Sequence, residues 1–158
     1  MKKSLILTIS LAFLLSACKK DHDNSGSAAN SWNFKGTTYT AATVVYVNGG
    51  SVANLSAIAT GATATSEDRL VFEFSTPPVS SGQMPITDSG DPNTVLVSIS
   101  KLSETGTTLY LNTETNVMAN VDIRNGKISA SFPGTIWMHN LANYYDSAEL
   151  SVGTVTQQ

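Results

Sequence analysis

One short segment concentrates the side chains that could recognise a ligand. Residues 137–146 read WMHNLANYYD and hold one of the two tryptophans and two of the five tyrosines. Aromatic faces stack on apolar ring surfaces, and nearby amides and acids bind hydroxyl groups, so this composition suits a sugar. The candidate binding residues are Trp137, His139, Asn140, Asn143, Tyr144 and Tyr145.

The same segment also has a plainer interpretation as part of the core. Trp137, Leu141 and Tyr144 are spaced as one face of one or two helical turns. Aromatic stripes at this spacing are usually buried. The sequence therefore favours a short helical cap packed on the domain, with ligand binding as the alternative.

Groups that could carry catalysis are scarce. After residue 30 the chain has one histidine, His139, and no cysteine follows Cys18. A Ser-His-acid triad would have to use His139, and no serine stands in a Gly-x-Ser-x-Gly turn. Zinc sites need more histidine or thiolate ligands than this. The sequence predicts no enzyme, no metal site and no cofactor, and a small hydrolase that uses His139 is the alternative.

An oxygen-rich loop is the other candidate for a bound ion. Asp88, Asp91 and Asn93 lie close together beside Pro92. Calcium takes six to eight oxygen ligands, but this spacing does not match an EF-hand loop. Asp, Asn and Pro also favour turns for reasons of backbone conformation. We therefore interpret the loop as a turn and keep calcium binding as the alternative.

The charge balance disfavours nucleic acid as a partner. Residues 31–158 hold five basic and ten acidic side chains. No basic stripe is present that could displace counterions from phosphates.

The elements that must position these residues are strands. From residue 31 onward apolar and polar residues alternate with period two, which is typical of half-buried strands. Asn48-Gly49 and Asn125-Gly126 favour two-residue hairpin turns. Gly36 separates the first two expected strands, as in a tight hairpin. The expected strands are 32–34, 39–41, 43–47, 52–59, 70–74, 95–100, 107–111, 117–123, 127–132 and 148–156. This pattern predicts an all-β antiparallel sandwich of about eight to ten strands, with a meandering barrel as the alternative.

The first residues have the form of a secretory signal. Lys2 and Lys3 precede an apolar run over residues 5–15, which is shorter than the roughly 20 residues that a membrane span needs. Small residues follow and end at Cys18. The polar, aperiodic residues 19–30 have the composition of a flexible tether, so we expect a signal peptide over 1–17, a tether over 18–30 and one domain over 31–158.

Several of these features resemble bacterial lipoproteins. Leu15-Ser16-Ala17-Cys18 resembles a lipobox, which implies cleavage before Cys18 and attachment of acyl chains such as palmitate to it. Lys20, Asp21 and Asp23 resemble the export signal of surface lipoproteins in Bacteroidota-type bacteria.

The domain resembles a family from the same bacteria. Its opening Trp32-to-Tyr39 hairpin, the segment 121–132 and the closing strand resemble small β-rich lipoproteins whose activity is not established, so no site carries over. Asp146-Ser147-Ala148 resembles an O-glycosylation acceptor in secreted proteins of these bacteria, which implies a glycan on Ser147.

Together these features predict a lipoprotein anchored in the bacterial outer membrane through Cys18 and facing the cell exterior. Its expected task is non-enzymatic binding of a glycan or of an envelope or host protein. The alternatives are a periplasm-facing structural or assembly role and, less favoured, the small hydrolase.

Overall fold

The computed structural model describes residues 29–113 and 116–158, and strands are the only regular elements among them. The strands are β1 (Ser31–Phe34), β2 (Thr37–Asn48), β3 (Ala53–Ala59), β4 (Glu67–Phe74), β5 (Gly82–Pro85), β6 (Val95–Ser103), β7 (Gly106–Asn112), β8 (Met118–Arg124), β9 (Lys127–Ser131), β10 (Thr135–Asn140), β11 (Ser147–Val152) and β12 (Val155–Thr156). The all-β prediction is confirmed.

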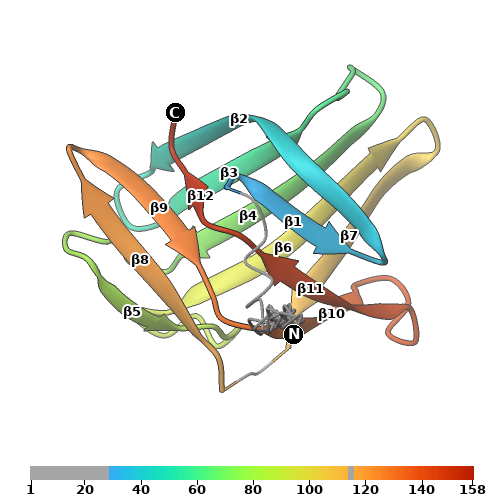
Figure 1. The fold of residues 1–158 in the computed structure, drawn as a ribbon. Coiled ribbons are helices and arrows are strands. Elements are labelled where there is room, and N and C mark those ends of the chain that lie inside the picture. Colours follow the sequence, from blue (N-terminus) through green and yellow to red (C-terminus); the bar gives the residue numbers. More distant parts are fainter. Residues whose placement is uncertain (1–28, 114–115) are drawn as a thin grey trace, which may run out of the picture.

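Eight of these strands close into an antiparallel barrel in the order β1-β11-β10-β7-β6-β4-β3-β2 (Figure 1). Closure depends on β1, which pairs with β2 on one side and with β11 on the other. This sheet therefore forms the barrel that the sequence pattern indicated as the alternative to a sandwich. A second, open sheet has the order β12-β9-β8-β5, and we call it the cap sheet.

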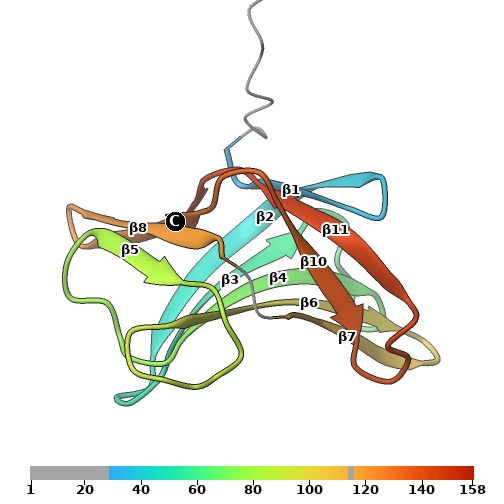
Figure 2. The same ribbon diagram turned by 90° about the horizontal axis from the view of Figure 1, so that it is seen from below.

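The two ends of the barrel are connected differently. At one end, called the turn end, neighbouring strands join through residues 35–36, 60–66, 104–105 and 141–146. At the opposite end the connections are longer. Along the chain, β5 comes between β4 and β6, β8 and β9 come between β7 and β10, and β12 follows β11. These excursions form the cap sheet, which lies over one half of the barrel (Figure 2). We call the end of the barrel that bears the cap sheet the capped end.

One hydrophobic core runs through both sheets. Leu70, Phe72 and Phe74 alternate along β4 and are fully buried, as the sequence predicts. The ring of Phe72 lies 6.3 Å from that of Phe132, which follows β9. The buried side chains of the barrel and the cap sheet form one cluster, so the cap sheet is part of the same core. Each large buried side chain contributes about 1.5–3 kcal/mol to folding.

Of the two Asn-Gly turns that the sequence predicts, only Asn125-Gly126 has the expected backbone. Asn48 and Gly49 lack positive φ, because β2 and β3 are joined by the four residues 49–52 and not by a two-residue turn. Asn125 and Gly126 have φ values of 53° and 73°, as a two-residue hairpin between right-twisted strands requires. Lys35 and Gly36 repeat this conformation between β1 and β2, with φ values of 52° and 74°. A lysine at positive φ is uncommon.

Three expectations are wrong in detail. The expected strand 148–156 is two strands, β11 and β12, which belong to different sheets because the chain leaves the barrel after Val152. The expected helical cap around residues 137–144 is the strand β10 and a loop. The strand β5 was not expected, because Pro77, Pro78 and Gly82 around it are typical of loops.

Candidate functional site

The aromatic segment lies at the turn end of the barrel. Along β10, Ile136 and Met138 enter the core, and Trp137 and His139 therefore point out of the barrel. Trp137 is 54% exposed. This exposure corrects the expectation that Trp137, Leu141 and Tyr144 pack into the core, since all three are exposed.

Tyr144 returns from the β10–β11 loop onto His139. The two rings lie parallel, with centroids 4.2 Å apart and an interplanar angle of 7°. The Nδ1 atom of His139 lies 3.3 Å from the carbonyl oxygen of Tyr144. We call Trp137, His139 and Tyr144 the aromatic platform, because their rings share the outer face of β10 and its loop.

The other predicted binding residues have different surroundings. Asn140 donates a hydrogen bond from Nδ2 to Oδ2 of Asp146, and its Oδ1 accepts one from the backbone of Ala142. Its role is therefore to hold the loop. The backbone of Asn143 bonds to Asn140 and Asp146 within the same loop. Tyr145 is 97% exposed at the loop tip.

Asp146 anchors the loop to two distant parts of the chain. It forms an ion pair with Lys35 and accepts a hydrogen bond of 2.7 Å from the hydroxyl of Tyr110. Lys35 also donates to the Tyr110 hydroxyl at 2.8 Å. These bonds, from Lys35 first and then from Asn140 and Tyr110, hold the pKa of Asp146 well below its usual range. We call Lys35, Tyr110, Asn140 and Asp146 the anchor cluster.

Sequence reasoning missed the anchor cluster. Lys35 and Asp146 are separated by 111 residues and Lys35 and Tyr110 by 75. No local pattern links such positions. The one available signal is a lysine in a two-residue hairpin turn, where asparagine or glycine is preferred.

A second cluster, made of a lysine, an aspartate and a tyrosine, lies farther inside the turn end. Lys101 pairs with Asp68 at 2.6 Å and donates to the hydroxyl of Tyr39 at 2.7 Å. Tyr39 in turn stacks on the buried ring of Trp32, with ring centroids 5.3 Å apart. Both clusters satisfy their charges internally, which removes them as free acid–base groups.

A groove adjoins the aromatic platform. It has a volume of about 250 Å³ and is lined by Thr107, Thr108, Leu109, Asn140, Leu141 and Ala142. The backbone N–H of Leu141 donates to the carbonyl of Leu109 at 2.8 Å and fixes the loop beside β7. We call this the turn-end groove.

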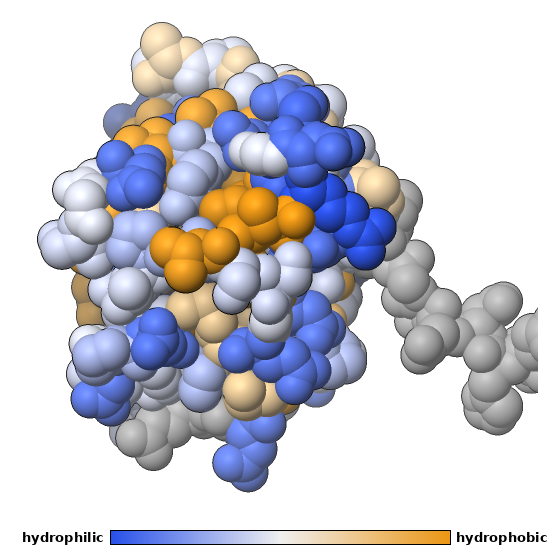
Figure 3. Space-filling model, turned by 90° about the vertical axis from the view of Figure 1, so that its left-hand side faces the viewer, coloured by the Kyte–Doolittle hydropathy of each residue, from blue (hydrophilic) through white to orange (hydrophobic). Residues whose placement is uncertain are grey.

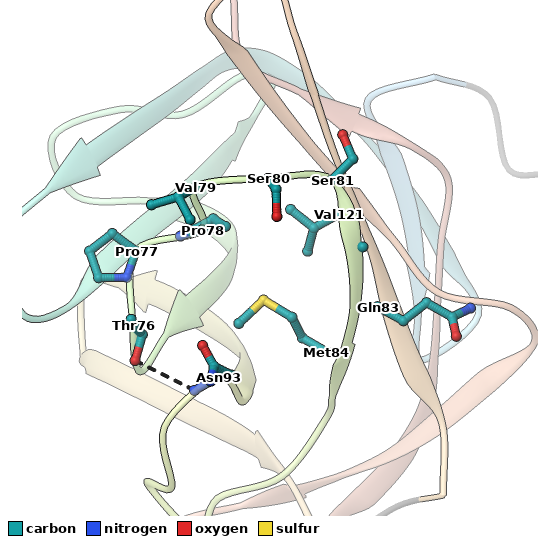
Figure 4. A pocket seen from close by; sticks show the side chains of 11 residues that line it. Thr76, Pro77, Pro78, Val79, Ser80, Ser81, Gln83, Met84, Asn93 and Val121 are labelled. Carbon is teal, nitrogen blue, oxygen red and sulfur yellow. Dashed lines mark hydrogen bonds between the residues drawn. The ribbon is translucent and has the colours of Figure 1, made fainter.

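The capped end carries a cavity of a different kind. It has a volume of about 270 Å³, lies between the 76–81 segment and the cap sheet, and has no ionisable side chain in its lining. In Figure 4, Met84 reaches into this cavity and Gln83 points away from it. Figure 3 shows hydrophobic side chains gathered in the middle of this face. Val52 and Val79 are exposed and lie in loops at this end of the barrel.

His139 lacks the partners of a catalytic base. In the described part of the chain its one hydrogen-bond partner is the carbonyl of Tyr144. Ser147 is its cross-strand neighbour on β11, so a glycan attached to Ser147 would share the outer face with the aromatic platform.

The loop with Asp88, Asp91 and Asn93 is a series of turns. Asn93 and Gly90 have positive φ, and the carbonyl of Asp91 accepts a hydrogen bond of 2.6 Å from the hydroxyl of Thr94. These turns give a backbone reason for the residue types. Within residues 29–113 and 116–158, no group of three His, Cys, Asp or Glu side chains could hold a metal ion.

Cys18, Lys20, Asp21 and Asp23 lie outside the described residues, so their predicted roles stay predictions. Among the residues that are described, no helix is long and apolar enough to cross a membrane. Comparison with protein-family models, with curated proteins and with solved structures finds no match to this chain.

Proposed function

We propose that this protein is a lipid-anchored, surface-displayed carbohydrate-binding module without catalytic activity. The observation that carries the proposal is the aromatic platform, in which Trp137 is 54% exposed on the same outer face of β10 as His139, and the ring of Tyr144 stacks on that of His139. Large aromatic rings gathered on one face expose apolar surface to water, and such patches commonly mark binding sites. Aromatic rings with polar neighbours suit the alternating apolar and hydroxyl-bearing surfaces of a sugar.

The platform is held in place before any ligand binds. The anchor cluster fixes the β10–β11 loop through Asp146, and the β-ladder with β7 and β11 fixes Trp137 and His139. A site that is already ordered loses less conformational entropy on binding.

The direction of the first strand supports outward display. β1 begins at Ser31 and runs toward the turn end. The predicted tether thus joins the domain on the side away from the β10–β11 loop. A tether of the length predicted for residues 19–30 would span roughly 19 Å, enough to lift the domain off a membrane. A lipid on Cys18 would then leave the platform facing away from the bilayer.

Tryptophan fluorescence gives a direct test. The chain has two tryptophans, and Trp32 is fully buried whereas Trp137 is exposed. Titration with cellohexaose, maltohexaose, xylohexaose and soluble mannan should change the emission of Trp137 for at least one of them. Trp137→Phe should remove that change and weaken binding measured by calorimetry.

The matched control is Val79→Ala, since Val79 is an exposed apolar residue at the capped end. It should bind as the wild type does. The proposal fails if none of the four saccharides binds, or if Trp137→Ala binds as tightly as the wild type.

A periplasm-facing assembly role is the second candidate. The exposed valines of the capped end favour it, because exposed apolar patches also mark protein interfaces. Protease treatment of intact cells separates the two proposals. Rapid loss of the protein supports surface display, and protection until the outer membrane is permeabilised supports the periplasmic role.

A further inference from the structure

We infer that the aromatic platform and the turn-end groove form one continuous site for an extended, uncharged oligosaccharide. This inference rests on the proposed function and specifies its ligand. Two features carry it: the two surfaces share one face of the barrel, and the surrounding charges leave no partner for an anion.

The continuity follows from the register of β7 and β10. His139 on the platform lies opposite Leu111, and Leu109 stands two residues along β7 on the same outer face. Leu109 lines the turn-end groove together with Leu141. Leu141 lies four positions after Trp137, which is about 13 Å at the rise of a strand. A single sugar ring would cover only part of this length.

The groove differs from the platform in what it offers. Its lining combines the hydroxyls of Thr107 and Thr108 with the apolar surfaces of Leu109 and Leu141. The platform offers ring faces. A chain of sugar rings can stack at one end and place hydroxyl groups in the groove at the other.

The basic side chains of the described domain are either held in ion pairs or distant from the site. Four of the five basic side chains in the described domain are held in ion pairs: Lys35 with Asp146, Arg69 with Glu67, Lys101 with Asp68 and Arg124 with Asp122. The fifth, Lys127, lies in the β8–β9 hairpin of the cap sheet.

An acidic side chain, that of Glu149, lies next to the aromatic platform. Glu149 is the cross-strand partner of Trp137, is exposed and forms no ion pair with any residue in 29–113 or 116–158. Its carboxylate can accept hydrogen bonds from sugar hydroxyls, and it repels uronate, sulfate or phosphate groups. The site therefore selects neutral saccharides over acidic ones.

The first experiment compares ligand lengths. Using the neutral series that binds in the fluorescence test, we expect the hexasaccharide to bind at least tenfold more tightly than the disaccharide. Leu141→Ala should reduce the affinity of the hexasaccharide and leave that of the disaccharide unchanged. Equal affinity for both lengths would overturn the continuous site while leaving saccharide binding itself intact.

The second experiment changes the charge. Hexagalacturonate should not bind the wild type at low salt, and Glu149→Lys should bind it measurably. Glu73→Lys, which changes an exposed acid on β4, is the matched control and should not gain this binding. Equal binding of hexagalacturonate and the neutral hexasaccharide by the wild type would overturn the preference for uncharged ligands. If the wild type bound none of the saccharides, the proposed function itself would be refuted.

Discussion

The inward-facing positions of β4 and β6 change character from one end of the barrel to the other. From the capped end, β4 presents Phe74, Phe72 and Leu70 to the core, and β6 presents Val95, Val97 and Ile99. At the turn end the next positions are Asp68 and Lys101, which pair with each other. A barrel end without a covering sheet is thus closed by paired charges and tyrosine hydroxyls, whereas the covered end is closed by apolar side chains.

This difference explains where each end can act. The capped end has exposed apolar surface and a cavity whose lining includes uncharged polar side chains such as Thr76, Ser80 and Asn93 but no aromatic ring. At the turn end the inward-facing charged side chains form ion pairs and hydrogen bonds with one another. These bonds hold the loops that carry the outward-facing rings. Rigid placement of exposed rings is what a saccharide site needs.

The largest expected effect lies at the capped end. Phe72→Ala removes a fully buried ring that faces Phe132, the residue directly after β9 of the cap sheet. We expect a loss of about 3–5 kcal/mol in the free energy of unfolding. Urea denaturation followed by circular dichroism measures it. A single transition would show that barrel and cap sheet unfold together, and two separate transitions would break the picture of one shared core.

Tyr110→Phe tests the turn end in the same way. The change removes the hydroxyl that accepts from Lys35 and donates to Asp146 but keeps the ring. Because both partners are charged, we expect a loss of about 1.5–3 kcal/mol in stability. Saccharide affinity should also fall, since the loop that carries Tyr144 loses an anchor. Unchanged affinity in a destabilised variant would separate the anchor cluster from the site.

The pH dependence of stability should reveal Asp146. Its pKa in the folded state is lowered, chiefly by the hydrogen bond from Lys35, whereas that of an unfolded aspartate is about 3.9. The contribution of Asp146 is therefore complete above the unfolded pKa and is lost as the pH falls toward the folded one. Melting temperatures of the wild type and Asp146→Asn should differ most near pH 7 and converge below about pH 4. A constant difference over this range would contradict the assignment.

The smallest expected effect is that of Val79→Ser. Val79 is 93% exposed at the rim of the capped-end cavity. Stability should change by less than about 0.5 kcal/mol, and saccharide binding should not change. A marked loss of binding in this variant would move the site to the capped end.

Much of the local structure could be predicted from the sequence, because the signals are short-range. Alternation identifies β3, β4 and β6 and their buried faces, and Asn125-Gly126 identifies the β8–β9 hairpin. β2 is interrupted in its alternation because a bulge between Ala41 and Thr43 shifts the phase, which is why it was expected as two pieces.

The candidate site could be found but not interpreted. The composition of residues 137–146 singles out this segment. Whether Trp137 packs inward or faces solvent depends on which neighbour fills the core, and here Ile136 and Met138 do. A spacing that fits a helix also occurs in a strand followed by a loop, so the sequence favoured the wrong alternative.

The sequence by itself determined that the chain forms antiparallel strands, where several of them turn and which of their faces are apolar. Only the tertiary structure decided that β1 closes a barrel, that three separate excursions form one cap sheet, and that Lys35, Tyr110 and Asp146 meet. The physical reason is range. Backbone preference and side-chain alternation act between neighbours in the chain, whereas closure, capping and ion pairing depend on segments that meet only when the whole core is buried.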